Sequence, residues 1–444
     1  MKKILAIALA AVMVFSVAAC GETASTSVEP AKTVESTEPA ASAEAEPATP
    51  AVTADETVNL TMWCIATEAD SNRHSYEAAI ADVTAKYPNI NFEWEATENE
   101  AYKTKIKTAV AANDMPDIFF TWSCAFLGDF VKQDRVYCLD NEVQKWASEL
   151  PEVMLGNTTY DGKHYGVPLT MNIVGLFANM DLLAQVGYDE VPGTYDEFIA
   201  CCDALNAAGI RPFGCAGKET WCVTEYLESV IEKSVGADTL NDIFLGRASW
   251  DNADVAAAVD RFQGLVNNGY FDPEGIALSN DEVKSNFMAG KTAFYMNGTW
   301  NCADFAKQEG LNVKVSEFPV IDSSKSQLGQ LIGGPSDTLA VAASSPNASL
   351  AAEFTLELGR EICHYGYLDG CGLPAWTPYY DTSSVNALTN AVSEICANAS
   401  AYVLFGDTAM PADEAAIYLE AVSKVYGCEV DGQGFIDSLS TQIR

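Results

Sequence analysis

Five of the eight tryptophans lie at the ends of predicted elements or in loops, rather than in the middle of an element. An indole presents a flat apolar face that stacks on the C–H face of a sugar ring, while amide and carboxylate groups satisfy the hydroxyls. For any one tryptophan, interior packing is an equally good interpretation, but the five together favour a carbohydrate-binding cleft. They are Trp63, Trp122, Trp221, Trp300 and Trp376, whereas Trp94, Trp146 and Trp250 are interpreted as structural.

Residue patterns of known enzyme classes are missing from the chain. There is no GxSxG, GxGxxG, GxxxxGK[ST] or HExxH pattern, and the three histidines, His74, His164 and His364, stand in unrelated contexts. The 62 carboxylates would allow the acid pair of a glycoside hydrolase, but their abundance singles out no pair. We therefore expect no catalytic residue, and a secreted glycoside hydrolase is the alternative.

The 13 cysteines do not follow a disulfide or metal-binding pattern. No CxxC occurs, and the adjacent Cys201 and Cys202 lie on a predicted helix, where they cannot pair without strain. No histidine stands near a cysteine pair, which disfavours zinc. The sequence predicts mostly buried thiols, no metal and no cofactor, and it leaves the oxidation state open.

The N-terminus has the features of an export signal. Lys2 and Lys3 precede a short apolar run that ends in Ala18-Ala19-Cys20, which resembles the lipobox of bacterial lipoproteins. We predict a signal peptide over 1–19 and lipidation of Cys20, and an ordinary signal peptide with an unrelated cysteine is the alternative. The Ala-, Ser-, Thr-, Glu- and Pro-rich stretch that follows, up to residue 56, predicts a disordered tether.

The formal net charge of −37 restricts the partners of the exported chain. Because nucleic acid and anionic lipid surfaces are polyanions, both are poor partners for such a protein. A membrane contact is therefore expected only through the lipid on Cys20.

The elements that would position these side chains alternate between strands and helices. Strands predicted at 58–63, 90–94 and 117–121 enclose helices at 75–87 and 102–112, an order that predicts a parallel sheet covered by helices. A second strand–helix block follows, and the C-terminal part is mostly helical. The fold class is therefore α/β, and the length of the folded part favours two domains.

Three segments stand in an order and at separations typical of one protein family: 116–122 (PDIFFTW), 165–172 (YGVPLTMN) and 287–300 (FMAGKTAFYMNGTW). This ordered set resembles the extracellular solute-binding proteins, family 1, of bacterial carbohydrate ABC transporters, the class that includes maltose-binding protein. Residues 194–212 and Gly333-Gly334-Pro335 are similar as well, so that the resemblance covers essentially all of 57–444.

The resemblance implies a periplasmic-binding-protein-like fold, in which two α/β lobes are joined by hinge crossings and enclose a ligand cleft. Lobe one would comprise 57–169 plus 331–358, and lobe two 170–330 plus 359–444. The ligand-binding residues carried over are Trp63, Glu68, Trp122, Asn172, Trp221, Trp300, Gly334 and Trp376.

Two positions depart from maltose-binding protein. Asn172 is an amide where that protein has a carboxylate, and Ser123 stands where it has an acid after the residue that matches Trp122. Different hydroxyls would be recognised, so maltose is not implied as the ligand.

The resemblance also implies a role. The chain would capture an oligosaccharide on the outer side of the bacterial cytoplasmic membrane, as a lipid-anchored monomer, and deliver it to ABC transporter permease subunits. A carbohydrate-binding surface protein without a role in transport is a further alternative.

Overall fold

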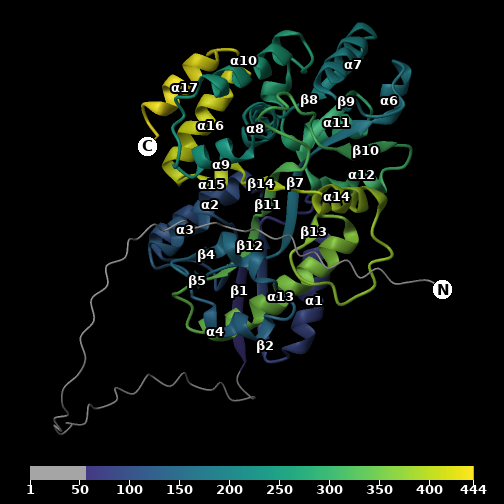
Figure 1. Ribbon diagram of the computed structural model, residues 1–444. Coiled ribbons are helices and arrows are strands. Elements are labelled where there is room, and N and C mark those ends of the chain that lie inside the picture. Colours follow the sequence, from purple (N-terminus) through teal and green to yellow (C-terminus); the bar gives the residue numbers. More distant parts are fainter. Residues whose placement is uncertain (1–56, 444) are drawn as a thin grey trace, which may run out of the picture. The chain divides into compact units, whose positions relative to one another are not determined.

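Strands β1 (Val58–Cys64), β2 (Ile90–Ala96) and β3 (Ile118–Trp122) pair in parallel, as their order in the sequence predicts. The computed structural model describes residues 57–443 (Figure 1). Two later strands, β12 (Asp337–Val341) and β6 (Val167–Pro168), extend this sheet in antiparallel fashion to the order β2-β1-β3-β12-β6. We call this sheet and the helices packed on it lobe one.

A second sheet has the order β14-β11-β7-β9-β8 and defines lobe two. Its centre is β7 (Thr170–Asn179), in which all ten residues are buried. The other strands are β8 (Arg211–Gly214), β9 (Thr292–Gly298), β11 (Gln330–Pro335) and β14 (Ala401–Val403), with β10 (Val313–Ser316) and β13 (Leu373–Pro374) paired to β7. Both sheets alternate with helices along the chain, so the predicted α/β fold class is confirmed.

The helices of lobe one include α13, which packs beside α1. Their bounds are α1 (Arg73–Lys86), α2 (Asn99–Ala112), α3 (Ala125–Val131), α4 (Asp140–Val143), α5 (Glu152–Leu155) and α13 (Ala348–Asp369). A two-stranded sheet of β4 (Thr159–Tyr160) and β5 (Lys163–His164) lies near them (Figure 1).

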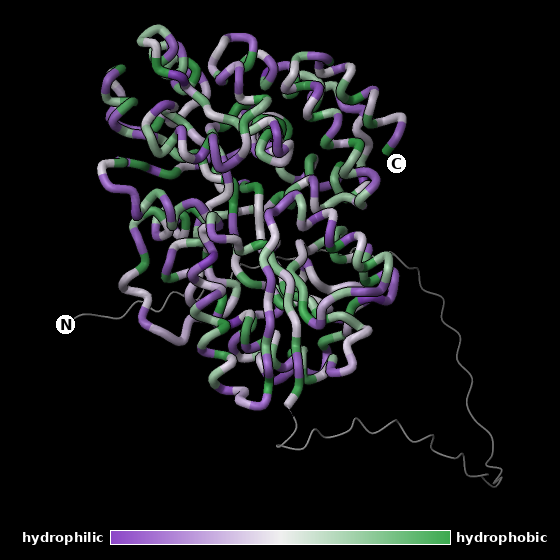
Figure 2. Tube along the Cα trace, turned by 180° about the vertical axis from the view of Figure 1, so that it is seen from behind, coloured by the Kyte–Doolittle hydropathy of each residue, from purple (hydrophilic) through white to green (hydrophobic). Residues whose placement is uncertain are grey.

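Lobe two carries the remaining helices, of which α8 packs against α10 and α16. They are α6 (Met180–Gln185), α7 (Tyr195–Ala207), α8 (Trp221–Val235), α9 (Ala237–Phe244), α10 (Ala253–Asn267), α11 (Asn280–Met288), α12 (Cys302–Lys307), α14 (Ala387–Ala397), α15 (Gly406–Ala409), α16 (Ala412–Tyr426) and α17 (Gly432–Ser440). Apart from α8, which is buried almost throughout, these helices carry polar residues on their outward faces, and Figure 2 shows hydrophobic and hydrophilic residues mixed along the chain.

Two lobe boundaries differ from those predicted. Strand β11, predicted to open the second segment of lobe one, pairs with β7 in the sheet of lobe two. Helix α13 continues through the boundary predicted at 358–359, and its residues as far as Cys363 belong to the core of lobe one. Gly359, at that boundary, lies inside α13, where a Cβ atom would lie 2.5 Å from a methyl group of Val167, so that this glycine allows close packing of α13 on β6.

The twelve cysteines of the described residues are all free thiols, and nine of them are buried. This agrees with the predicted use of cysteine as a small apolar side chain. The signal peptide predicted over 1–19, Cys20 and the tether up to residue 56 lie outside the described residues. Within 57–443, no helix combines the length and the apolar character that crossing a bilayer requires.

Candidate ligand-binding site

A cavity of about 560 Å³ is lined by residues of both lobes. From lobe one come the loop between β1 and α1, the start of α2 and the ends of β3 and β12. From lobe two come β7, the start of α8, the segment after β9, and α15. The wall therefore forms where strands and helices end, which is where ligands of α/β proteins usually bind.

Five of the eight residues predicted to bind ligand line this cavity: Trp122, Asn172, Trp221, Trp300 and Gly334. Trp122 ends β3 and is 9% exposed, with its ring packed edge-on against Phe120 and Phe126 at centroid distances of 5.0 Å. The cavity thus brings the five predicted residues together from separate elements. Their contact with a ligand stays a prediction.

Two indoles of lobe two form a joint aromatic surface. Trp221 is the first residue of α8, and Trp300 lies in the turn after β9. Their ring centroids are 6.1 Å apart at an interplanar angle of 58°. Both rings are half-buried, so each keeps a face on which an apolar surface can stack.

Asn172 is 5% exposed, and its amide is already engaged within the protein. Its oxygen accepts a hydrogen bond from the Thr299 hydroxyl at 3.0 Å, and its nitrogen donates to Thr170 at 3.3 Å and to the Cys371 carbonyl at 3.4 Å. The side chain ties β7 to two neighbouring segments. In this structure Asn172 therefore holds together the segments that form its part of the cavity wall.

The other three predicted residues do not line the cavity. Trp376 is 3% exposed, packs on Trp146 in the core of lobe one, and donates from its indole nitrogen to the Pro168 carbonyl at 2.8 Å. The ring of Trp63 is covered by the Lys105 ammonium at 3.9 Å from its centroid. Glu68 pairs with Arg73 at 3.0 Å, and its side chain is 88% exposed.

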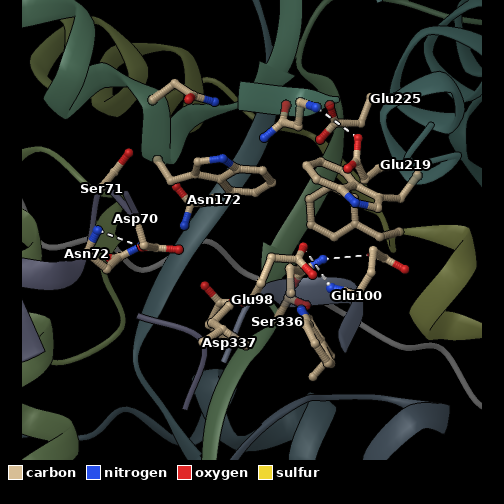
Figure 3. Close-up of a pocket in the computed structure, with 18 of the residues that line it drawn as sticks. Asp70, Ser71, Asn72, Glu98, Glu100, Asn172, Glu219, Glu225, Ser336 and Asp337 are labelled. Carbon is tan, nitrogen blue, oxygen red and sulfur yellow. Dashed lines mark hydrogen bonds between the residues drawn. The ribbon is translucent and has the colours of Figure 1, made fainter. Parts of the chain in front are cut away.

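Several carboxylates in the wall were not predicted as site residues. Asp70 and Asp337 lie at one side of the cavity, and Glu100, Glu219 and Glu225 lie at the other (Figure 3). Glu225 follows Trp221 by four residues, and Asp337 closely follows Gly334. Helical spacing in the first case and sequence proximity in the second were the signals that could have identified them.

Burial perturbs the titration of these carboxylates. It raises the pKa of Asp337 to about 7, and the nearby Asp70 carboxylate contributes to the rise. Burial also raises the pKa of Glu219 and, together with the neighbouring Glu228 and Asp407, that of Glu225. No group of His, Cys, Asp and Glu side chains in residues 57–443 has an arrangement that could hold a metal ion.

The sequence model of one family, described as bacterial extracellular solute-binding protein, matches residues 69–355. The chain belongs to this family. The resemblance seen in the sequence is thereby confirmed.

Relatives of this solute-binding protein share about a quarter of their residues with it. Binding proteins of Brucella abortus and Brucella suis are 24% identical over 233 residues, and the chain spans only 55% of their length. The multiple sugar-binding protein of Streptococcus mutans is 24% identical over 309 residues, which are 66% of this chain and 70% of that protein. The melibiose/raffinose/stachyose-binding protein of Bacillus subtilis is 24% identical, covering 69% of this chain and 71% of its own.

Solved structures share the fold. One, determined in work on xylan utilization by the thermophilic bacterium Caldanaerobius polysaccharolyticus, has a TM-score of 0.84 and 29% identity, covering 87% of this chain and 100% of its own. A chitin oligosaccharide binding protein has a TM-score of 0.79 and 22% identity, with coverages of 87% and 98%. The two-lobe architecture of the family therefore applies to this chain.

Proposed function

We propose that this solute-binding protein captures an oligosaccharide outside the cell and delivers it to the permease of an ABC transporter, and that a lipid on Cys20 holds it at the membrane. The observation that carries the proposal is the cavity, which is lined by Trp122 of lobe one and by Trp221 and Trp300 of lobe two. Aromatic faces that oppose polar groups match the two chemical faces of a sugar. The names of its relatives, several of which are sugar-binding proteins, support the same class of ligand.

A chain of β-1,4-linked xylose is the first ligand to test, because the solved structure with 29% identity comes from work on xylan utilization. Isothermal titration calorimetry of the purified protein against xylo-, cello-, manno-, malto- and chito-oligosaccharides and raffinose would identify the bound class. Binding of at least one of them is the expected result. Failure to bind any saccharide would contradict the proposal.

Binding without turnover separates this role from that of a glycoside hydrolase. The tightest ligand, incubated with the protein for hours, should be recovered intact. A product that disappears when a carboxylate of the cavity is replaced would instead indicate an enzyme.

A further inference from the structure

Aspartate and glutamate side chains outnumber lysines in the wall of the cavity by eight to three. Six of the eight are labelled in Figure 3, where they surround the cavity from both lobes. Such an excess is unfavourable to the protein itself, because like charges in a site of low dielectric repel one another. The composition of the wall therefore restricts the charge of the ligand.

The three ammonium groups compensate little of this charge. Lys103 lies 3.0 Å from Glu100 and 3.8 Å from Asp407. Lys284 pairs with Asp304 at 2.9 Å. Lys218 is exposed, where water screens its charge. An anionic group that entered the cavity would have to compete with carboxylates that already hold two of the three cations.

Glu225 shows that the wall has unused hydrogen-bonding capacity toward a ligand. It is 2% exposed, and neither of its carboxyl oxygens has a hydrogen-bond partner of ordinary geometry among residues 57–443, although the backbone of Gly298 lies close enough to influence its titration. The indole nitrogen of Trp221, one turn earlier on α8, also lacks one. A buried polar group without a partner is costly, and a sugar hydroxyl can both donate to a carboxyl oxygen and accept from an indole N–H.

Asp70 and Asp337 add to the negative potential from lobe one. Asp337 lies on β12, and Asp70 on the loop that leads from β1 to α1. Burial raises the pKa of Asp337, and repulsion from the Asp70 carboxylate contributes to the rise, so a second negative charge is unfavourable here. A ligand carboxylate would add a further one.

We propose, on the basis of the proposed function, that the cavity selects its saccharide by charge: it binds uncharged sugar units and excludes units that carry a carboxylate, such as uronic acids. The hydroxyls of the sugar would donate hydrogen bonds to the carboxylates. The aromatic rings would supply contact area for a sugar chain of any linkage. Selection by charge thus operates independently of which neutral sugar is bound.

The test uses sets of saccharides in which the free acid and its methyl ester share one skeleton and differ chiefly in charge. Trimers of β-1,4-linked glucose, β-1,4-linked mannose and α-1,4-linked galactose are each compared with the corresponding uronic acid trimer and its methyl ester, and xylotetraose with its glucuronosyl-substituted form and the ester of that form. Calorimetry at pH 8 gives each affinity. For the backbone that binds, we expect the neutral sugar and the methyl ester to agree within about tenfold and the free acid to bind at least ~100-fold more weakly.

A double variant and a control variant test whether the acidic residues of the cavity wall cause the selection against charged saccharides. The double variant Asp337→Asn/Glu219→Gln should reduce the ratio between ester and free acid by about tenfold or more, whereas Glu309→Gln, which removes an exposed carboxylate outside the cavity, should leave the ratio unchanged. A free acid that binds as tightly as its methyl ester would overturn the inference and leave oligosaccharide binding intact. No binding of any neutral saccharide would overturn the proposed function and this inference with it.

Discussion

Lys103 of α2 and Asp407 of α15 form an ion pair of 3.8 Å that joins lobe one to lobe two at the cavity. Both side chains are largely buried. Burial acts to lower the pKa of Lys103, but the Asp407 and Glu100 carboxylates outweigh it, so that the pKa lies above its ordinary value and the ammonium stays charged. The pair is therefore a contact that separation of the lobes has to break.

Replacing Lys103 with Met should weaken this link between the lobes. We expect ligand to dissociate about 3- to 10-fold faster, as measured by stopped-flow tryptophan fluorescence, because a partly buried ion pair contributes on the order of 1 kcal/mol. Lys105→Met is the matched control, since Lys105 lies on the same helix over Trp63 and outside the cavity wall. Equal dissociation rates in both variants would show that the pair does not hold the lobes together.

The tryptophans of the cavity should differ in how they affect binding and stability. Trp221→Ala and Trp300→Ala should each reduce affinity by about thirtyfold, equivalent to ~2 kcal/mol, with little change in the melting temperature of the free protein, because both rings are half-buried. Trp122→Ala should reduce both quantities, since its ring packs among aromatic side chains. If Trp221→Ala and Trp300→Ala unfold the protein and keep its affinity, these rings are core residues.

Trp376 is expected to contribute to stability alone. Trp376→Phe removes the 2.8 Å hydrogen bond to Pro168 and leaves a space in the core of lobe one. Urea unfolding should show a loss of about 2–4 kcal/mol. Affinity for the tightest saccharide should stay within about twofold. A large loss of affinity at unchanged stability would instead restore the sequence-based assignment of Trp376 to the ligand site.

Asp337 should make the stability of the free protein depend on pH. Its pKa in the fold is about 7 against an ordinary 3.8, so that the folded state retains a proton that the unfolded chain releases. Stability therefore falls as pH rises from 3.8 towards 7. Asp337→Asn should raise the melting temperature at pH 8 and have little effect at pH 4. Equal shifts at both pH values would contradict this assignment.

Lipidation of Cys20, which lies outside the described part of the chain, can be tested in living cells. Cys20→Ala should release the protein from the membrane fraction or leave it unprocessed, as judged by immunoblotting of cell fractions. A variant that is trimmed normally and stays in the membrane fraction would disprove the lipid anchor.

The sequence predicted the fold well where burial is one-sided. Strands β1 and β2 alternate between buried and more exposed residues, helices α1 and α2 repeat apolar residues at helical spacing, and all four lie where these patterns place them, whereas β3 was predicted from a continuous apolar run and is buried throughout. Helix α8 shows no such pattern. Residues Cys222 to Val235 are all buried, including Glu225, Glu228 and Glu232, so that charged residues face the interior and the periodicity that marks a helix is lost.

The same burial explains why the carboxylates of the site were missed. Tryptophans at the ends of strands were recognisable from sequence because their type and position are both unusual. Glu225 and Asp337 are two among 62 carboxylates, and only the folded chain shows which of them lie against the cavity. Trp376 was misplaced for the opposite reason, since a loop position in sequence does not reveal that its ring turns back into the core.

The unpaired cysteines have a practical consequence. Burial raises the pKa of all twelve described thiols, that of Cys302 to about 12, so that few form the reactive thiolate at neutral pH and access decides which of them reacts. Cys428, which follows α16 in lobe two, is exposed. A maleimide dye should therefore attach to the unmodified protein chiefly at this position, and a second dye on an engineered cysteine in lobe one would report the distance between the lobes while sugar is added.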